Sequence, residues 1–156
     1  MRVLGLVPAR SGSSEVEYKN IRMLGGNPLM YYAIHEGLAS SLDRVVLSTD
    51  STDFLDIGKS FGVDTPFLRP HNLSTNTAST FDVIIHCLDF LAKSENYIPD
   101  AVFLLRPTSP FRTYSQINEA INLLESKKVD SVCAMECVTQ HPYFIFKKDV
   151  EGKMVE

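Results

Sequence analysis

Long apolar runs are missing from the sequence, and a transmembrane helix would need about 20 consecutive apolar residues. The apolar start MRVLGLVPAR is brief and lacks a cleavage signature, which predicts a strand rather than a signal peptide. A basic excess is missing too, because 15 Lys and Arg residues stand against 19 Asp and Glu residues, for a net charge of −4. We therefore expect no membrane and no nucleic-acid partner, and any anionic ligand must be held by a local site.

Cysteine is scarce, and its positions do not form a metal motif. Cys87, Cys133 and Cys137 are an odd number of thiols, and no histidine pair completes a zinc set with them. Unpaired thiols are typical of protein interiors and of reducing compartments. We expect a cytoplasmic protein with reduced, buried cysteines.

The length and composition suit one globular domain. A chain of 156 residues with 44% hydrophobic and 22% charged residues can bury its own core. Apolar runs predict buried strands, and apolar periodicity or capping signals predict helices between them. The predicted strands cover residues 2–7, 45–47, 100–105 and 130–135, and the predicted helices cover residues 28–39, 52–61, 81–91 and 114–124. This alternation predicts a Rossmann-like α/β fold, a mainly parallel sheet flanked by helices.

Local signals mark where helices begin and which face they bury. Asn27 is expected to cap a helix whose first residue is Pro28. Thr113 and Gln116 have the spacing of a capping box for the last predicted helix. The helix over residues 81–91 has an apolar face made of Phe81, Ile84, Ile85, Leu88 and Leu91.

Two segments are expected outside the main sheet. The extended piece over residues 63–68 contains a proline, which places it at a sheet edge or beyond it. The tail from His141 alternates weakly around the letters EGK, which predicts a hairpin or a projecting arm.

Unusual loops follow three of the predicted strands. They cover residues 8–20, 48–51 and 106–112. Ligands of parallel α/β sheets bind outside the carboxyl ends of the strands, where such loops meet. The sequence therefore predicts a pocket at that edge of the sheet.

The loop over residues 8–20 has the chemistry of an anion cradle. The small residues 11–14 allow backbone N–H groups to approach an anion, and Arg10 can fork onto phosphate oxygens. Lys19 adds a second positive charge, and Asn20 can hydrogen-bond a ribose or a base. The loop matches neither G-x-x-x-x-G-K-[ST] nor G-x-G-x-x-G. On these residues alone, a phosphate loop and an ordinary polar connection both remain open.

The loop over residues 106–112 combines arginines with hydroxyls. Arg106 leaves the strand end, Thr108 and Ser109 supply hydroxyl groups, and Arg112 adds a further charge. This combination suits an acidic, polyhydroxylated ligand. A rigid turn that leads into a capped helix explains the same residues equally well.

Taken together, the motifs resemble the acylneuraminate cytidylyltransferase family, the CMP-sialic acid synthetases. Its loop of the type P-A-R-x-G-S-K-x-I-x-x-K-N is matched by Pro8, Ala9, Arg10, Gly12, Ser13, Val16, Lys19 and Asn20. LGGNPLMYYAI, VVLSTDS, FLRPHNLSTNTAST, LLRPTSPFRT and DSVCAMECVTQHP follow in the family's order and spacing. The resemblance implies a fold of the nucleotide-diphospho-sugar transferase type, with a nucleotide-binding α/β domain over residues 1–138. It also implies that residues 139–156 begin a C-terminal β arm through which members form homodimers.

The resemblance implies transfer of CMP from CTP to an acidic nonulosonic sugar, with release of pyrophosphate. Arg10 and Lys19 are then the catalytic residues that stabilise charge on the triphosphate. The implied nucleotide-binding residues are Ala9, Arg10, Gly12, Ser13, Asn20, Arg69 and Thr80, and the implied sugar-binding residues are Arg106, Thr108 and Ser109. Sialic, legionaminic and pseudaminic acids all fit the implied sugar class.

The chain departs from the family pattern in three places. Ser14 stands where the family has a lysine, and Glu15 and Glu17 add negative charge to the same loop. Arg106 stands where the family commonly has glutamine. We expect Mg²⁺ to accompany CTP, although the sequence does not supply the family's paired metal-binding aspartates.

Two alternatives to this function stay open at the level of sequence. One is a nucleotidyltransferase for another sugar, and the other is a truncated nucleotide-binding domain without turnover.

Overall fold

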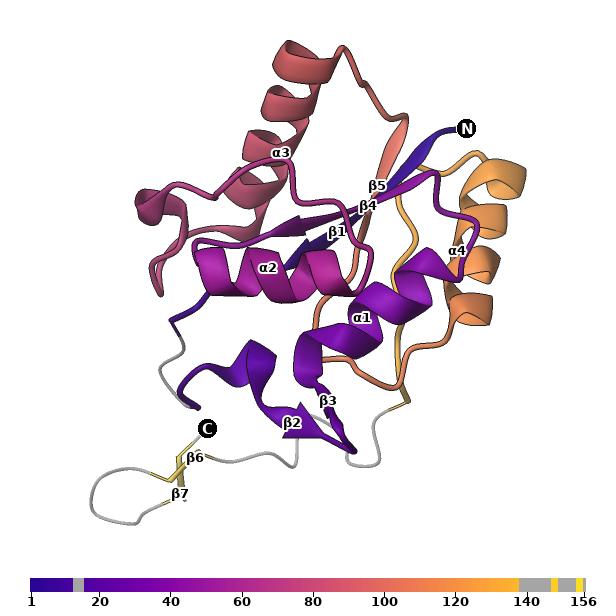
Figure 1. The fold of residues 1–156 in the computed structure, drawn as a ribbon. Coiled ribbons are helices and arrows are strands. Elements are labelled where there is room, and N and C mark those ends of the chain that lie inside the picture. The colour runs from indigo at the N-terminus through magenta and orange to yellow at the C-terminus, as the bar shows by residue number, and fades with distance from the viewer. Residues whose placement is uncertain (13–15, 138–146, 149–153, 156) are drawn as a thin grey trace.

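A three-stranded parallel sheet forms the centre of the molecule, in a computed structural model that describes residues 1–12, 16–137, 147–148 and 154–155 (Figure 1). Its strands are β1 (Val3–Pro8), β4 (Arg44–Ser48) and β5 (Ala101–Leu104). β1 lies in the middle, where Leu6 pairs with Val46 on one side and with Leu104 on the other. The expected α/β fold with a parallel sheet is confirmed.

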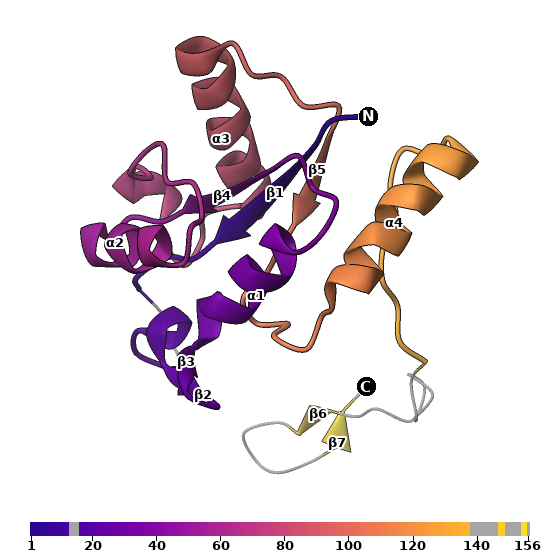
Figure 2. The same cartoon turned by 45° about the vertical axis from the view of Figure 1, so that its right-hand side comes forward.

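In the part of the chain that the structure describes, four α-helices connect and cover the strands. They are α1 (Leu29–Leu38), α2 (Thr52–Ser60), α3 (Thr80–Glu95) and α4 (Tyr114–Lys127). The shorter elements are η1 (Lys19–Ile21), η2 (His71–Leu73), the pair β2 (Met23–Leu24) and β3 (Asn27–Pro28), and the pair β6 (Lys147–Lys148) and β7 (Met154–Val155). Figure 2 shows α3 on one side of the strands and α1 on the other. None of the described helices is long and apolar enough to cross a bilayer.

The alternation of side chains along β1 divides the core into two layers. Leu4 and Leu6 pack in the layer that contains Cys87 and Leu91 of α3. Val3 and Val7 pack in the opposite layer, which contains buried residues of the other three helices: Met30, Ala33, Ile34, Phe54, Ile117 and Ile121. The strand is therefore apolar throughout because both of its faces are covered.

Several local predictions are confirmed. Thr113 accepts a hydrogen bond from the Gln116 amide, and the Gln116 side chain accepts one from the Thr113 amide, which completes the capping box of α4. The structure adds a cap for α2, where the Ser51 side chain accepts a hydrogen bond from the amide of Phe54. The extended piece over residues 63–68 lies at the outer edge of β4, where Asp64 forms a single parallel bridge with Val46.

The predicted fourth strand over residues 130–135 is wrong. Residues 131–137 form no strand, and Val132 and Met135 are exposed. Residues 130–132 line a cavity together with β5 and α4, so the segment lies near the sheet without forming a ladder. An apolar run becomes a strand only when its peptide groups pair with a neighbouring strand.

Helix α1 begins later than its sequence signals predict. Asn27 and Pro28 form β3, which pairs with β2 across a turn at Gly25 and Gly26. Both glycines have positive φ, at 56° and 94°. This Gly-Gly hairpin occupies the residues expected to cap the helix.

The apolar face of α3 is rotated from its predicted position. Phe81 and Ile85 are exposed, whereas Val83, Cys87 and Leu91 are the buried residues of the helix.

The expectation of three buried cysteines is also wrong, because Cys133 and Cys137 are exposed. All three thiols are unpaired.

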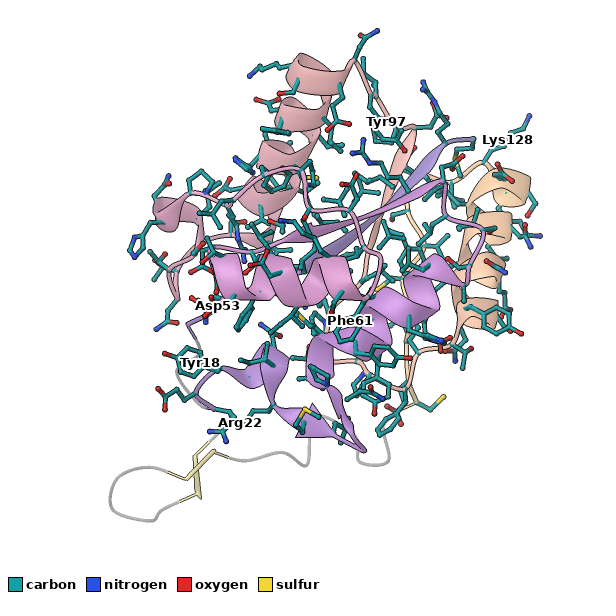
Figure 3. The ribbon with its side chains drawn as sticks, in the orientation of Figure 1. Tyr18, Arg22, Asp53, Phe61, Tyr97 and Lys128 are labelled. Atoms are coloured by element: carbon teal, nitrogen blue, oxygen red, sulfur yellow. The ribbon has the colours of Figure 1, made fainter. Side chains whose placement is uncertain are left out.

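The amino edge of the sheet carries a charged cluster. Arg44 donates hydrogen bonds to Asp64 and Glu95, and its guanidinium lies 5.2 Å from the centre of the Tyr97 ring. Figure 3 shows Tyr97 far from Tyr18, which belongs to the loop that follows β1. This cluster therefore braces the end of the sheet away from the loops of the predicted pocket.

Candidate functional site

Loops after the strands meet at the carboxyl edge of the sheet, as the parallel topology predicts. The amide of Ala9 donates to the carbonyl of Ser48 at 2.9 Å, which joins the end of β1 to the end of β4. The amide of Arg69 donates to the carbonyl of Thr49 at 2.8 Å. These backbone bonds fix three segments beside one another at the edge where ligands of such sheets bind.

A cavity of about 380 Å³ opens between these segments, within the size range of small-molecule sites. Its lining includes four positively charged residues: Arg10, Lys19, Arg69 and Arg106. The polar lining residues are Asn20, Thr75, Asn76, Thr80 and Thr108. No carboxylate belongs to this lining in the described part of the chain. The cavity is therefore built for an anion.

Arg69 is the most constrained of these cations. Only 5% of the residue is exposed, and its Nε and Nη2 atoms are buried without a hydrogen-bond partner among the described residues. Burial lowers the pKa of Arg69, the Asp50 carboxylate opposes this change, and the positive charge of Arg10 adds to it. A buried guanidinium without a bonded anion is costly to the fold, which is the pattern expected of a residue kept for a ligand.

Arg10 is held from several sides. Its Nη1 donates to the carbonyl of Thr75 at 2.5 Å, in the loop that precedes α3. Its own carbonyl accepts a hydrogen bond of 2.9 Å from the side chain of Asn20, which is buried. Asn20, at the end of the loop after β1, and Thr75, in the loop before α3, thus hold Arg10 at the wall of the cavity.

The amino end of α3 adds a positive potential. Thr80 is the first residue of this 16-residue helix, and both Thr80 and Val83 line the cavity. Ser79 caps the helix by accepting from the amide of Phe81. Because a helix dipole is positive at its amino end, this placement favours a negatively charged ligand.

The structure brings together most of the predicted site residues. Arg10, Lys19, Asn20, Arg69, Thr80, Arg106 and Thr108 line the cavity. Ala9 is buried beside it, and Gly12 is exposed and does not line it. Ser109 lines a different cavity with Arg112, whose guanidinium lies over the Phe103 ring at 5.9 Å. Ser13 lies outside the described residues.

The sequence did not predict that two residues of the loop before α3 line the cavity. It also did not predict the contact between Asp50 and Ser11. Thr75 and Asn76 line the cavity, and their only signal was a run of hydroxyl and amide residues after Arg69. Asp50 accepts hydrogen bonds of 2.8 Å from both the amide and the hydroxyl of Ser11. The sequence does not indicate this pair, because its members lie 39 residues apart.

The described residues do not fit a metal ion held by the protein. No group of three His, Cys, Asp or Glu side chains comes together among them, and the cavity lining contains no carboxylate. Both carboxylate oxygens of Asp50 are engaged by Ser11. These residues are suited to binding the negative charge of a ligand directly.

Several known proteins resemble this chain over much of its length. CMP-N,N'-diacetyllegionaminic acid synthase of Legionella pneumophila is 35% identical over 159 residues, which covers 100% of this chain and 67% of that protein. N-acylneuraminate cytidylyltransferase of Escherichia coli is 38% identical over 126 residues, 80% of this chain and 29% of that protein. Pseudaminic acid cytidylyltransferase of Campylobacter jejuni is 36% identical over 121 residues, 77% of this chain and 52% of that protein. The chain thus spans from less than a third to about two thirds of these relatives.

Solved structures give the same fold. A CMP:2-keto-3-deoxy-manno-octonic acid synthetase complexed with CTP superposes with a TM-score of 0.66 at 18% identity, over 82% of this chain and 49% of that one. A cytidylyltransferase of Leptospira borgpetersenii gives 0.62 at 22% identity, over 82% and 50%. A family model described as Cytidylyltransferase matches residues 4–148. The resemblance seen in the motifs is confirmed, and the chain belongs to the cytidylyltransferase family.

Proposed function

We propose that the protein transfers a cytidylyl group from CTP to an acidic nonulosonic sugar and releases pyrophosphate. Arg69 carries this proposal, because this buried residue lines a cavity with three further cations, and its Nε and Nη2 atoms have no hydrogen-bond partner among the described residues. Relatives named for legionaminic, acylneuraminic and pseudaminic acids support the sugar class. A triphosphate together with a sugar carboxylate matches the positive lining.

In the proposed reaction, the anomeric hydroxyl of the sugar attacks the α-phosphorus of CTP. A new phosphorus–oxygen bond forms, the bond to the β-phosphate breaks, and the hydroxyl proton leaves to solvent. Arg10 and Lys19 stabilise the negative charge that moves onto the departing pyrophosphate. Asn20, Arg69 and Thr80 hold the nucleotide, with Ala9, Gly12 and Ser13 shaping its loop. Arg106 and Thr108 face the sugar, whereas Ser109 lines a separate cavity and is given no contact with it.

The proposal includes Mg²⁺, a homodimer and a cytoplasmic location. Mg²⁺ would arrive on the triphosphate oxygens, because the described cavity lining offers it no carboxylate. Three unpaired thiols support a reducing compartment. The segment from residue 139 supports the homodimer because it resembles the start of the arm through which family members dimerise. Its described residues include the β6–β7 pair.

Calorimetric titration tests the nucleotide. CTP, UTP, GTP and TTP are titrated separately into the protein with Mg²⁺ present. We expect CTP to bind at least tenfold more tightly than the others, which corresponds to about 1.4 kcal/mol. Equal binding of all four would overturn the assignment to cytidine.

Pyrophosphate release tests the reaction. The chain is incubated with CTP and, in turn, with sialic, legionaminic and pseudaminic acids and a neutral hexose. We expect release with at least one acidic sugar and none with the hexose. Binding of CTP without release from any acidic sugar would support the alternative of a nucleotide-binding domain without turnover.

A further inference from the structure

Arg10 lies between two anchors, Ala9 and Ser11, which are hydrogen-bonded to residues at or just after the end of β4. On its amino side, the amide of Ala9 donates to the carbonyl of Ser48 at 2.9 Å. On its carboxyl side, the amide of Ser11 donates to Asp50 Oδ1 and the Ser11 hydroxyl donates to Oδ2, both at 2.8 Å. The first anchor is a backbone bond, so it persists in any variant. The second anchor depends entirely on the side chain of Asp50.

The remaining contacts of Arg10 depend on where these anchors place it. Its carbonyl receives the Asn20 side chain, and its guanidinium reaches the Thr75 carbonyl. The first contact closes the loop over residues 8–20 on itself, and the second joins it to the loop before α3, so a shift of the backbone at Ser11 alters them together. A misplacement on the order of 1 Å in a charged binding group is costly.

We propose that Asp50 is a positioning residue that fixes the Arg10 loop for anion binding by clamping Ser11. The inference rests on the proposed function, since Arg10 is taken to contact the triphosphate of the substrate. Asp50 touches Ser11 rather than the cavity, so its effect on the ligand is indirect.

Charge and position give Asp50 opposite effects, which makes the inference testable. As a carboxylate near Arg69, Asp50 reduces the positive potential of the site. If only its charge mattered, Asp50→Ala and Asp50→Asn would both tighten the binding of an anion. If it positions the loop, Asp50→Ala weakens binding, whereas Asp50→Asn retains an oxygen that accepts from the Ser11 amide and preserves binding.

The chain offers a matched control at the opposite edge of the same two strands. Asp43 Oδ2 accepts a hydrogen bond of 2.6 Å from the amide of Val3, where β1 begins. Asp43→Ala therefore removes the same kind of carboxylate-to-amide bond between the β1 and β4 segments. It does so at the end of the sheet away from the cavity.

The experiment measures the Kd for CTP and the Tm of the wild-type chain and of four variants: Asp50→Ala, Asp50→Asn, Ser11→Ala and Asp43→Ala. We expect Asp50→Ala to raise the Kd about tenfold, the size of effect typical of losing a hydrogen bond to a charged group. Ser11→Ala should raise the Kd by less, and Asp50→Asn should leave it within twofold or lower it. Asp43→Ala should lower the Tm and leave the Kd within twofold.

Three results would overturn the inference. These are an unchanged or lower Kd for Asp50→Ala, an equal rise for Asp50→Asn, or an equal rise for Asp43→Ala. Inorganic tripolyphosphate serves as a second probe that lacks the base and the ribose. If the wild-type chain binds tripolyphosphate without preferring CTP, the cytidine proposal fails and the same variants decide the role of Asp50. If it binds neither, both proposals fail.

Discussion

The ring of His86 packs edge to face against the ring of Phe67, with centroids 4.8 Å apart and planes at 83°. Phe67 lies two residues before Arg69. Burial lowers the pKa of His86, the positive charge of Arg69 lowers it further, and Asp89 opposes them. The Nδ1 atom of His86 is buried without a partner among the described residues. The neutral imidazole is therefore the form that this packing accepts.

Stability should fall in mild acid because of His86. The unfolded chain takes up a proton near the ordinary pKa of 6.5, whereas the folded chain takes it up only at lower pH. The unfolding free energy therefore decreases as the pH falls below 6.5, by at most about 1.4 kcal/mol per pH unit from this group. His86→Leu should flatten this decline in denaturant unfolding between pH 7.5 and 5, and His71→Gln, at an exposed position, should not. An equal slope in wild type and His86→Leu would contradict the assignment.

Arg69→Met should separate stability from binding. The substitution removes a buried charge that has no bonded partner and replaces it with a flexible apolar chain, so we expect the free energy of unfolding to rise by about 1 kcal/mol. The same variant should lose CTP binding. Thermal unfolding and calorimetry on one sample measure both effects. Arg106→Met, at an exposed lining residue, should leave the Tm unchanged, and a lower Tm for Arg69→Met would show that Arg69 supports the fold.

The cysteines should react in two classes. Burial raises the pKa of Cys87 to about 12, so this thiol is both inaccessible and protonated at neutral pH. Cys133 and Cys137 are exposed. Mass spectrometry after iodoacetamide treatment should show label on these two in the native protein and on all three after denaturation. Rapid native labelling of Cys87 would mean that the layer beneath α3 opens readily.

Gly58→Ala should destabilise the contact of α2 with the sheet. A Cβ at this buried position would lie 2.4 Å from Leu47 Cδ2 and 3.1 Å from Val63 Cγ1. Overpacking costs about 1–3 kcal/mol, which exceeds the helix-propensity gain of about 1 kcal/mol for replacing glycine with alanine. Gly12→Ala is the control, because its Cβ meets nothing within 4 Å. Urea unfolding compares the two, and equal stability would show that Leu47 moves aside without cost.

The features that local chemistry determines were predictable from the sequence. Periodicity and caps identified α2, α3 and α4, and parallel topology brought Arg10 and Arg106 to one edge. The incorrect predictions have a different cause, because they concern features that depend on pairing between strands. Residues 130–135 have the composition of a strand, but pairing with β5 is a property of the whole sheet. Asn27 and Pro28 have the local signals of a helix start, but they form one strand of the hairpin that turns at Gly25 and Gly26.

The burial of the site residues was not predictable from local sequence. Nothing around Arg69 in the sequence indicates that it is buried, because its place is set by a backbone bond to Thr49, 20 residues earlier. The clamp of Asp50 on Ser11 has the same long-range character. Motifs indicated which residues gather at the sheet edge, and the packing of distant segments determined which of them face the cavity.

The cationic cavity belongs to a chain whose net charge is −4. An approaching anion is therefore repelled at long range and attracted only near the opening, within a Debye length of about 10 Å at 0.1 M salt. The overall charge of the protein therefore does not attract anionic ligands from a distance. We expect association to proceed at unsteered rates, with selectivity among anions expressed in how long each one stays.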